Sequence, residues 1–212
     1  TLHEPPRFLL QPSPVGDVLI VAAATGIVEL HPIEVALSIA LERVALRTGM
    51  IPTPVNGSAP HPEGSPSAIA ERAADAVEEH FDGAEHDGGA GARHPLDLPW
   101  DWTGVHGFTR AALEAVCTIP YGETASYGEV AVLAGSPGAA RAVGTACART
   151  PFSILVPVHR VVRADGSIGE YGGRPEVKRA LLDLPAPAWA FRQRDPSPEL
   201  PSVVDGLLGT SR

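Results

Sequence analysis

Four residues in the second half of this 212-residue chain could carry chemistry. His159 and Arg160 follow a short apolar run, and Arg141 and Arg149 lie on a stretch with helical spacing. Histidine exchanges protons near neutral pH, whereas the guanidinium of arginine pairs with phosphate and carboxylate groups. These residues are therefore candidates for proton transfer and for contact with a polyanion.

The pattern of cysteines and histidines argues against a metal site. Cys117 and Cys147 are the two cysteines of the chain, too few for a disulfide framework or a four-cysteine zinc site. Cys117 has apolar neighbours and is expected in the core. The histidines of the first half that lack a cysteine companion are His31, His80, His86 and His94. We therefore expect no metal, no cofactor and a reduced, cytoplasmic protein, nucleoid-associated if prokaryotic.

The charge is distributed unevenly along the chain. Residues 1–104 hold five Arg against fifteen Asp and Glu, a net of −10, whereas residues 105–194 hold ten Lys and Arg against seven acids, a net of +3. This split is expected if only the second half meets phosphates, although a basic domain without a polyanion partner gives the same pattern. No run of 18 apolar residues exists, so we expect no membrane span, and no signal peptide is visible at the N-terminus.

The periodicity of the first half predicts strands followed by helices. Short apolar runs separated by Pro and Gly predict strands at 8–10, 18–21 and 26–30. Helical spacing then predicts helices at 33–49 and 67–81, joined by a loop rich in Pro, Gly and Ser. Residues 83–95 are low in apolar content and are expected to be a mobile loop.

The second half is expected to be mostly helical, with helices at 108–116, 126–134, 136–149 and 175–184. Ser126 and Glu129 have the spacing of a capping box and predict a helix start. Ser136 as N-cap and Pro137 at the first helical position predict the next one. Two short helices joined by a tight turn have the outline of a helix-turn-helix, although adjacent helices often merely pack together.

Five short motifs, in order, resemble those of the O6-alkylguanine-DNA alkyltransferases. They are Pro120-Tyr-Gly-Glu-Thr124, Ser126-Tyr-Gly-Glu129, Pro137-Gly-Ala-Ala-Arg141-Ala-Val-Gly144, Pro157-Val-His-Arg-Val161 and Tyr171-Gly-Gly173. The resemblance is continuous from Phe108 to Leu184 and fainter over the first half. It implies that members rotate a damaged guanine out of the duplex and move its alkyl group onto a cysteine.

The resemblance also implies a fold class, α+β, and a division of the chain. Residues 1–104 would form an N-terminal α+β domain with a ribonuclease-H-like small antiparallel sheet and helices. Residues 105–185 would form a C-terminal helical domain whose helix-turn-helix lies in the DNA minor groove. Residues 186–212 would be a Pro-rich tail.

Roles for individual residues follow from the same resemblance. Arg141 would fill the space that the flipped base leaves, Tyr127 would press against the phosphate 3′ of that base, and Tyr171 would pack near the base. The DNA-binding residues would be Tyr127, Ala139, Ala140, Arg141, Gly144 and Arg149. The lesion pocket would contain Tyr127, Cys147, Val158, His159, Arg160 and Tyr171. For His159 and Arg160 a purely structural role behind the pocket is the alternative.

Three positions of the family's catalytic network are changed in this chain. The position of the acceptor cysteine is Val158, which has no thiolate and cannot accept an alkyl group. The position of the glutamate that orients the family's histidine falls on Pro185, and Asp183 lies about 200° around the helix from it. The position of the hinge asparagine falls on Thr150. No catalytic residue is therefore expected, although His159 is retained.

With these changes the chain resembles the alkyltransferase-like subgroup of the family. Its members bind O6-alkylguanine, do not repair it, and hand the lesion to nucleotide excision repair. The sequence thus predicts a monomeric, non-enzymatic sensor of O6-alkylguanine in double-stranded DNA, with excision-repair proteins as partners. One alternative is a true alkyltransferase, either an inactivated variant or one that uses Cys147. Another is a DNA-binding regulator that reads no lesion.

Overall fold

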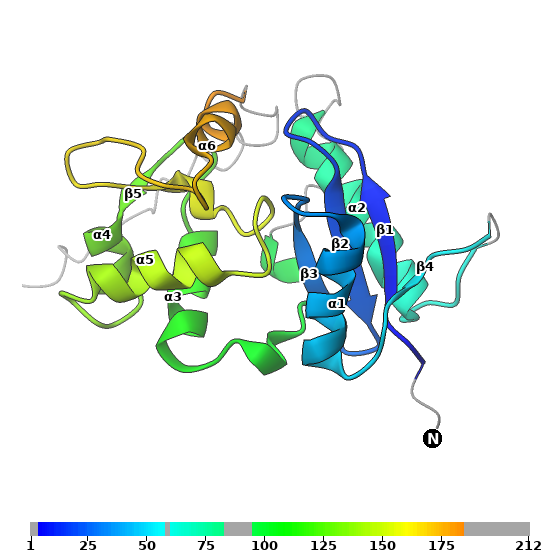
Figure 1. Cartoon of the computed structure of the whole chain (residues 1–212). Coiled ribbons are helices and arrows are strands. Elements are labelled where there is room, and N and C mark those ends of the chain that lie inside the picture. The colour runs from blue at the N-terminus through cyan, green and yellow to red at the C-terminus, as the bar shows by residue number, and fades with distance from the viewer. Residues whose placement is uncertain (1–3, 58–59, 83–94, 185–212) are drawn as a thin grey trace, which may run out of the picture.

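The computed structural model describes residues 4–57, 60–82 and 95–184 of the chain. The predicted mobile loop 83–95 lies, except for its last residue, outside the described residues, and so do Pro185 and the tail 186–212. Figure 1 shows a sheet flanked by helices from the first half and a group of helices from the second half beside it.

A four-stranded sheet forms the centre of the first half, in the order β3-β2-β1-β4. Its strands are β1 (Arg7–Gln11), β2 (Val18–Ala23), β3 (Gly26–Pro32) and β4 (Thr53–Pro54). The first three pair antiparallel at the predicted places, with Leu9 opposite Ile20 and Ile20 opposite Leu30. The sheet is mixed, however, because β4 runs parallel to β1. The expectation of an antiparallel sheet is therefore wrong at this edge, and the ribonuclease-H-like arrangement stays a prediction.

Two helices cover opposite faces of this sheet, α1 (Leu37–Thr48) and α2 (Pro66–Phe81). Successive residues of a strand point to opposite faces. Val18, Ile20 and Ala22 accordingly pack in the cluster that contains α2. Leu19 and Val21 pack with Ala40 and Val44 of α1. β2 is therefore buried on both faces, which explains its unbroken apolar run.

The second half contains four helices among the described residues, α3 (Gly107–Cys117), α4 (Tyr127–Leu133), α5 (Ala140–Arg149) and α6 (Pro175–Leu182). Two-residue strands β5 (Ala125–Ser126) and β6 (Val161–Val162) pair in parallel. Single 3-10 turns lie at Pro95–Asp97, Trp102–Gly104 and Val158–Arg160. None of the helices in the described part is long and apolar enough to cross a membrane.

The capping box predicted before α4 is confirmed. The Ser126 hydroxyl accepts from the Glu129 N–H at 3.2 Å, and the Glu129 carboxylate accepts from the Ser126 N–H at 2.6 Å. The start predicted for the next helix is wrong, because α5 begins at Ala140 and not after Ser136. Gly138 has a φ of 88°, which a right-handed helix does not allow, so residues 136–139 form a turn instead.

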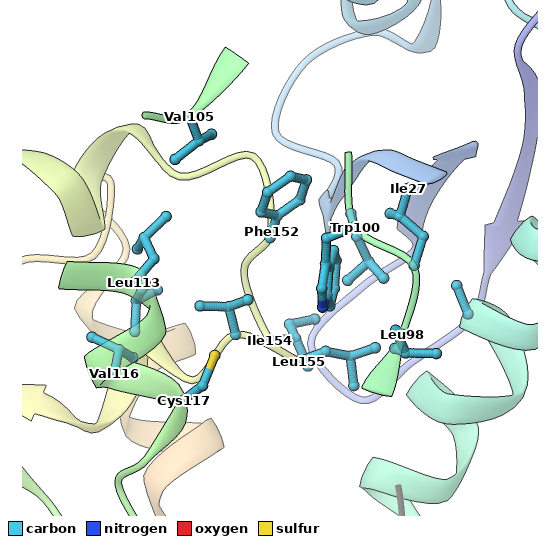
Figure 2. Close-up of a cluster of buried hydrophobic side chains, with 14 of the residues drawn as sticks. Ile27, Leu98, Trp100, Val105, Leu113, Val116, Cys117, Phe152, Ile154 and Leu155 are labelled. Carbon is cyan, nitrogen blue, oxygen red and sulfur yellow. The ribbon is translucent and has the colours of Figure 1, made fainter. Parts of the chain in front are cut away.

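A continuous hydrophobic core joins the two halves. Figure 2 shows Phe152 from the second half beside Trp100 and close to Ile27 of β3. The ring of Phe152 is fully buried, with its centroid 4.8 Å from that of Trp100 and 5.2 Å from that of Trp102. The Leu30 N–H donates to the Pro151 carbonyl at 2.7 Å, which fixes β3 against the segment after α5.

Truncating this ring should destabilise the whole chain. We expect Phe152→Ala to lower the free energy of unfolding by about 3–5 kcal/mol, because it removes a buried aromatic ring and leaves a cavity. Phe152→Leu fills most of that space and should lose about 1 kcal/mol. Denaturant unfolding followed by circular dichroism measures both. Equal losses for the two variants would show that Phe152 does not fill the junction as described.

Candidate functional site

A cavity of about 370 Å³ lies between the two halves. Its wall from the first half comes from β3, α1 and the segment between them, through Glu29, His31, Glu34, Val35, Ala40, Arg43 and Arg47. Its wall from the second half comes from α4, α5 and the segments after α5 and β6, through Tyr127, Gly144, Cys147, Ala148, Arg149, Thr150, Ser153, Val158, Glu170, Tyr171 and Gly172.

Six of the residues predicted from the sequence come together in this cavity: Tyr127, Gly144, Cys147, Arg149, Val158 and Tyr171. Gly144 and Cys147 share one face of α5, because residues three apart on a helix are neighbours. Gly144 leaves room for the Tyr127 ring, whose Cε1 atom lies 3.8 Å from where a Cβ would stand. Burial raises the pKa of Tyr171 to about 12, although the nearby Ser153 side chain acts in the opposite direction. These residues form a wall of aromatic and aliphatic surface with few charges.

Val158 contributes an aliphatic side chain to this wall and is 4% exposed. His159 and Arg160, also predicted in the pocket, do not line the cavity. They line a second cavity of about 180 Å³ behind it, together with residues of α6. Val158 faces one cavity and the next two residues face the other because all three lie in the 3-10 turn Val158–Arg160. Successive side chains in such a turn point about 120° apart.

His159 and Arg160 are buried and form a basic cluster with the partly buried His80. The Arg160 guanidinium donates to the Ile119 carbonyl at 2.9 Å and lies 4.7 Å from the centre of the Tyr121 ring. The rings of His159 and His80 meet edge to face with centroids 6.2 Å apart. Within the described ranges, none of these three basic side chains has a carboxylate partner. These contacts are those expected if His159 and Arg160 have a structural role behind the pocket. They are less compatible with a role in lining the 370 Å³ cavity.

Burial keeps both histidines neutral. Desolvation, with the charge of Arg160, lowers the pKa of His80 to about 4. Desolvation also lowers the pKa of His159 well below its ordinary value, assisted by Arg160, His80 and Lys178. A histidine with so low a pKa is a weak proton acceptor, because its imidazolium form is strongly disfavoured.

The two cysteines are protonated in the folded protein. Cys117 lies in the core, as the sequence predicts, and burial raises its pKa to about 12. Cys147 lines the 370 Å³ cavity, and burial raises its pKa to about 12 as well, although Lys178 acts in the opposite direction. Because the thiolate is the nucleophile, a protonated Cys147 is a poor nucleophile near pH 7.

The remaining predicted residues lie along α5. Ala139 is the residue before the helix, and Ala140 and Arg141 form its first turn. Arg141 is exposed and has no ion pair in the described part of the chain. Arg149 lies at the other end of α5, where it reaches the cavity wall. Arg141 does not line the cavity.

The polar wall from the first half was not predicted from the sequence. Glu29 is buried on β3 and pairs with Arg47 of α1 and with His31, whose Nε2 lies 2.6 Å from the carboxylate. The Nδ1 atom of His31 lies 2.7 Å from the Pro32 carbonyl, so both ring nitrogens face oxygen acceptors. The alternation of Glu29 with His31, the residue just after the predicted strand at 26–30, was the available signal. No cluster of three or more potential metal ligands occurs within residues 4–57, 60–82 and 95–184.

The buried His159 and the partly buried His80 should make stability depend on pH. Because the pKa of His80 is lower in the folded state than its ordinary value of 6.5, protonation favours unfolding. Stability is complete above pH 6.5 and is lost as the pH falls toward 4, by up to about 3 kcal/mol from this group. Thermal unfolding of His80→Gln between pH 7 and pH 4 should show a weaker pH dependence than the unchanged protein. The control is His106→Gln, an exposed site, and an unchanged slope for His80→Gln would contradict the burial of a neutral imidazole.

The second half of this chain is similar in sequence to known proteins. The model of the family described as "6-O-methylguanine DNA methyltransferase, DNA binding domain" matches residues 107–186. The methylated-DNA–protein-cysteine methyltransferase of Mycobacterium bovis is 50% identical over 95 residues, which cover 45% of this chain and 57% of that protein. The match therefore spans little more than half the length of that relative. The inducible enzyme of Bacillus subtilis is 43% identical over 94 residues, covering 44% of this chain and 52% of the relative.

Solved structures extend the similarity over the first half. The structure of Mycobacterium tuberculosis OGT in complex with DNA is 33% identical, with a TM-score of 0.60, and the alignment covers 89% of this chain and 99% of that one. An O6-methylguanine-DNA methyltransferase from Pyrococcus kodakaraensis is 21% identical, with a TM-score of 0.57 over 84% of this chain and 98% of that one, and shares the fold. Both the mixed α+β fold and the sequence thus place this chain in the methylated-DNA–protein-cysteine methyltransferase family.

Proposed function

We propose that this chain binds O6-alkylated guanine in duplex DNA and does not transfer the alkyl group. The observation that carries this proposal is the side chain of Val158 in the wall of the 370 Å³ cavity. The family resemblance puts the acceptor cysteine at this position. A valine there offers an apolar surface to an alkyl group and no electron pair to attack it.

Binding to DNA is proposed from the family and from α4 and α5. The matched family model is a DNA-binding domain, and the M. tuberculosis relative was solved with DNA. Small residues at Ala139, Ala140 and Gly144 would let α5 approach a narrow minor groove, with α4 and α5 acting as a helix-turn-helix. Arg141, exposed in the first turn of α5, would enter the base stack.

The damaged base would then lie outside the duplex. Flipping requires a few kcal/mol of unstacking and unpairing, and less for a poorly paired base, so the lesion itself contributes to selectivity. The flipped base would enter the cavity between Tyr127 and Tyr171, with its alkyl group toward Val158. As a monomeric, cytoplasmic sensor, the chain would hand the lesion to nucleotide excision repair. This partner is proposed from the resemblance to the alkyltransferase-like subgroup.

A second candidate function is alkyl transfer to Cys147, since this residue also lines the cavity. Two observations weigh against it. Burial keeps the thiol protonated, with a pKa of about 12. His159, the family's proton acceptor, points into the other cavity and has a pKa well below its ordinary value.

Restoring the acceptor cysteine should not restore a normal rate. We expect Val158→Cys to accept a methyl group slowly, because the carboxylate position falls on Pro185 and His159 is a weak base. Single-turnover transfer from O6-methylguanine duplex, followed by intact-protein mass, measures the rate. Val158→Ser controls for the change in size. Transfer by Val158→Cys as fast as by the M. bovis relative would show that the remaining network is intact.

Arg141 should matter for the lesion more than for plain DNA. Arg141→Ala and Tyr127→Ala should weaken binding to an O6-methylguanine duplex by more than they weaken binding to the undamaged duplex, because the flipped state alone uses Arg141 in the base stack and presses Tyr127 against the 3′ phosphate. A 2-aminopurine beside the lesion should brighten with the unchanged protein and less with each variant. Arg72→Ala, at an exposed site on α2, is the matched control. Equal losses on both duplexes and a dark probe would contradict base flipping.

A further inference from the structure

Arg163 lies beside Tyr127 although the two residues are far apart in the sequence. The parallel pair β5–β6 sets Ala125 opposite Val161 and Ser126 opposite Val162. Tyr127 and Arg163 are the next residues of the two segments. The start of α4 and the end of β6 are thereby held together by the backbone, and Arg163 lies at the edge of the proposed DNA-binding helices.

Gly169 brings the two side chains toward the same point. A Cβ on this buried glycine would lie 3.5 Å from the Tyr127 hydroxyl and 3.7 Å from both Cγ and Nε of Arg163. Both side chains therefore pass directly over the backbone of Gly169. The positive charge of Arg163 also acts on Tyr127, since it opposes the rise in the pKa of Tyr127 that burial and Cys147 produce.

The backbone at Arg163 is fixed by a tight turn. Its N–H donates to the Ser167 carbonyl at 2.9 Å, and its carbonyl accepts from the Gly166 N–H at 2.9 Å. Asp165, the acidic residue within this turn, accepts from the hydroxyl and N–H of Ser167. A side chain on a fixed backbone loses less entropy when it binds a ligand than one on a loose loop.

The guanidinium of Arg163 is available for an external anion. Arg163 is exposed and forms no ion pair within the described ranges. Lys178, a basic residue whose pKa the charge of Arg163 helps to lower, is 1% exposed and donates to the Val161 carbonyl at 2.6 Å, so it faces the interior. Glu170 is the acidic neighbour of Tyr127 and would repel a phosphate. The positive charge of Arg163 acts on Tyr127 in the opposite direction to Glu170 and would offset that repulsion.

We propose that Arg163 and Tyr127 together bind one phosphodiester of the DNA duplex. The Tyr127 hydroxyl would donate one hydrogen bond, and the guanidinium of Arg163 would donate others and neutralise the phosphate charge. This inference rests on one part of the proposed function, namely that Tyr127 at the start of α4 faces the DNA. It adds a phosphate contact from the segment after β6 to those expected from α5.

The salt dependence of binding to undamaged duplex tests this contact. The slope of log affinity against log salt should be about −3 to −5 for the unchanged protein. Arg163→Gln keeps most of the side chain but not the charge, and should weaken binding roughly 3- to 10-fold at low salt and make the slope shallower by about one unit. Arg163→Lys keeps the charge and should retain the slope. Arg179→Gln, an exposed site on α6, should change neither quantity.

Two outcomes would overturn the proposal. If Arg163→Gln binds with unchanged affinity and slope, Arg163 contacts no phosphate. If Arg163→Gln and Arg163→Lys lose affinity equally while both slopes stay unchanged, Arg163 supports Tyr127 by packing alone. Tyr127→Phe combined with Arg163→Gln should lose less than the product of the two single losses, because both remove contacts to one phosphate. If the unchanged protein binds the O6-methylguanine duplex no more tightly than the undamaged duplex, the proposed function is contradicted. The test of Arg163 on undamaged DNA is unaffected by that result.

Discussion

The junction between β3 and the segment after α5 determines the geometry of the site. The Phe152 ring is buried against Trp100 and Trp102, and the Leu30 N–H is bonded to the Pro151 carbonyl. The chain runs from this junction through a buried stretch to Val158. Because the junction joins β3 to the segment after α5, and both line the 370 Å³ cavity, the polar wall from the first half and the aliphatic wall from the second half lie across this cavity from each other.

Behind the aliphatic wall, burial and the charge of Arg160 both lower the pKa of the neighbouring histidines, His80 and His159. His80, His159 and Arg160 are basic groups packed together with no carboxylate partner in the described part of the chain. The cluster is compatible with burial because both histidines stay neutral and Arg160 is bonded to a carbonyl. Under these conditions His159 contributes packing to the back of the site and has little capacity for proton transfer. The aliphatic Val158 and the weakly basic His159 are therefore both consistent with the proposed binding without alkyl transfer.

Local signals in the sequence predicted the elements well, whereas contacts between distant segments could not be predicted. The capping box at Ser126 depends on four consecutive residues and was read correctly. The start of α5 was misplaced because Gly138 adopts a left-handed conformation that Ser136 and Pro137 do not reveal. The strand β4 was missed because it has two residues, one of them Pro54, and is defined by its pairing with β1.

The site likewise contains residues that local motifs predicted and contacts between distant segments that they could not predict. Tyr127, Cys147, Val158 and Tyr171 were predicted through motif resemblance and do share one cavity. The pairing of Glu29 with Arg47 and the position of Arg163 beside Tyr127 depend on how strands and helices pack, so no short motif contains them. The direction of His159 depends on a 3-10 turn, whose effect on side-chain direction a linear motif does not record.

The central claim is that this cavity holds an alkylated base without reacting with it. The most direct measurement incubates the protein with an O6-methylguanine duplex and records binding and intact-protein mass on the same sample. We predict binding that is selective for the lesion over the undamaged duplex, with no change in mass and with the methylated base intact after release. A mass increase of one methyl group, on Cys147 or any other residue, would contradict the account.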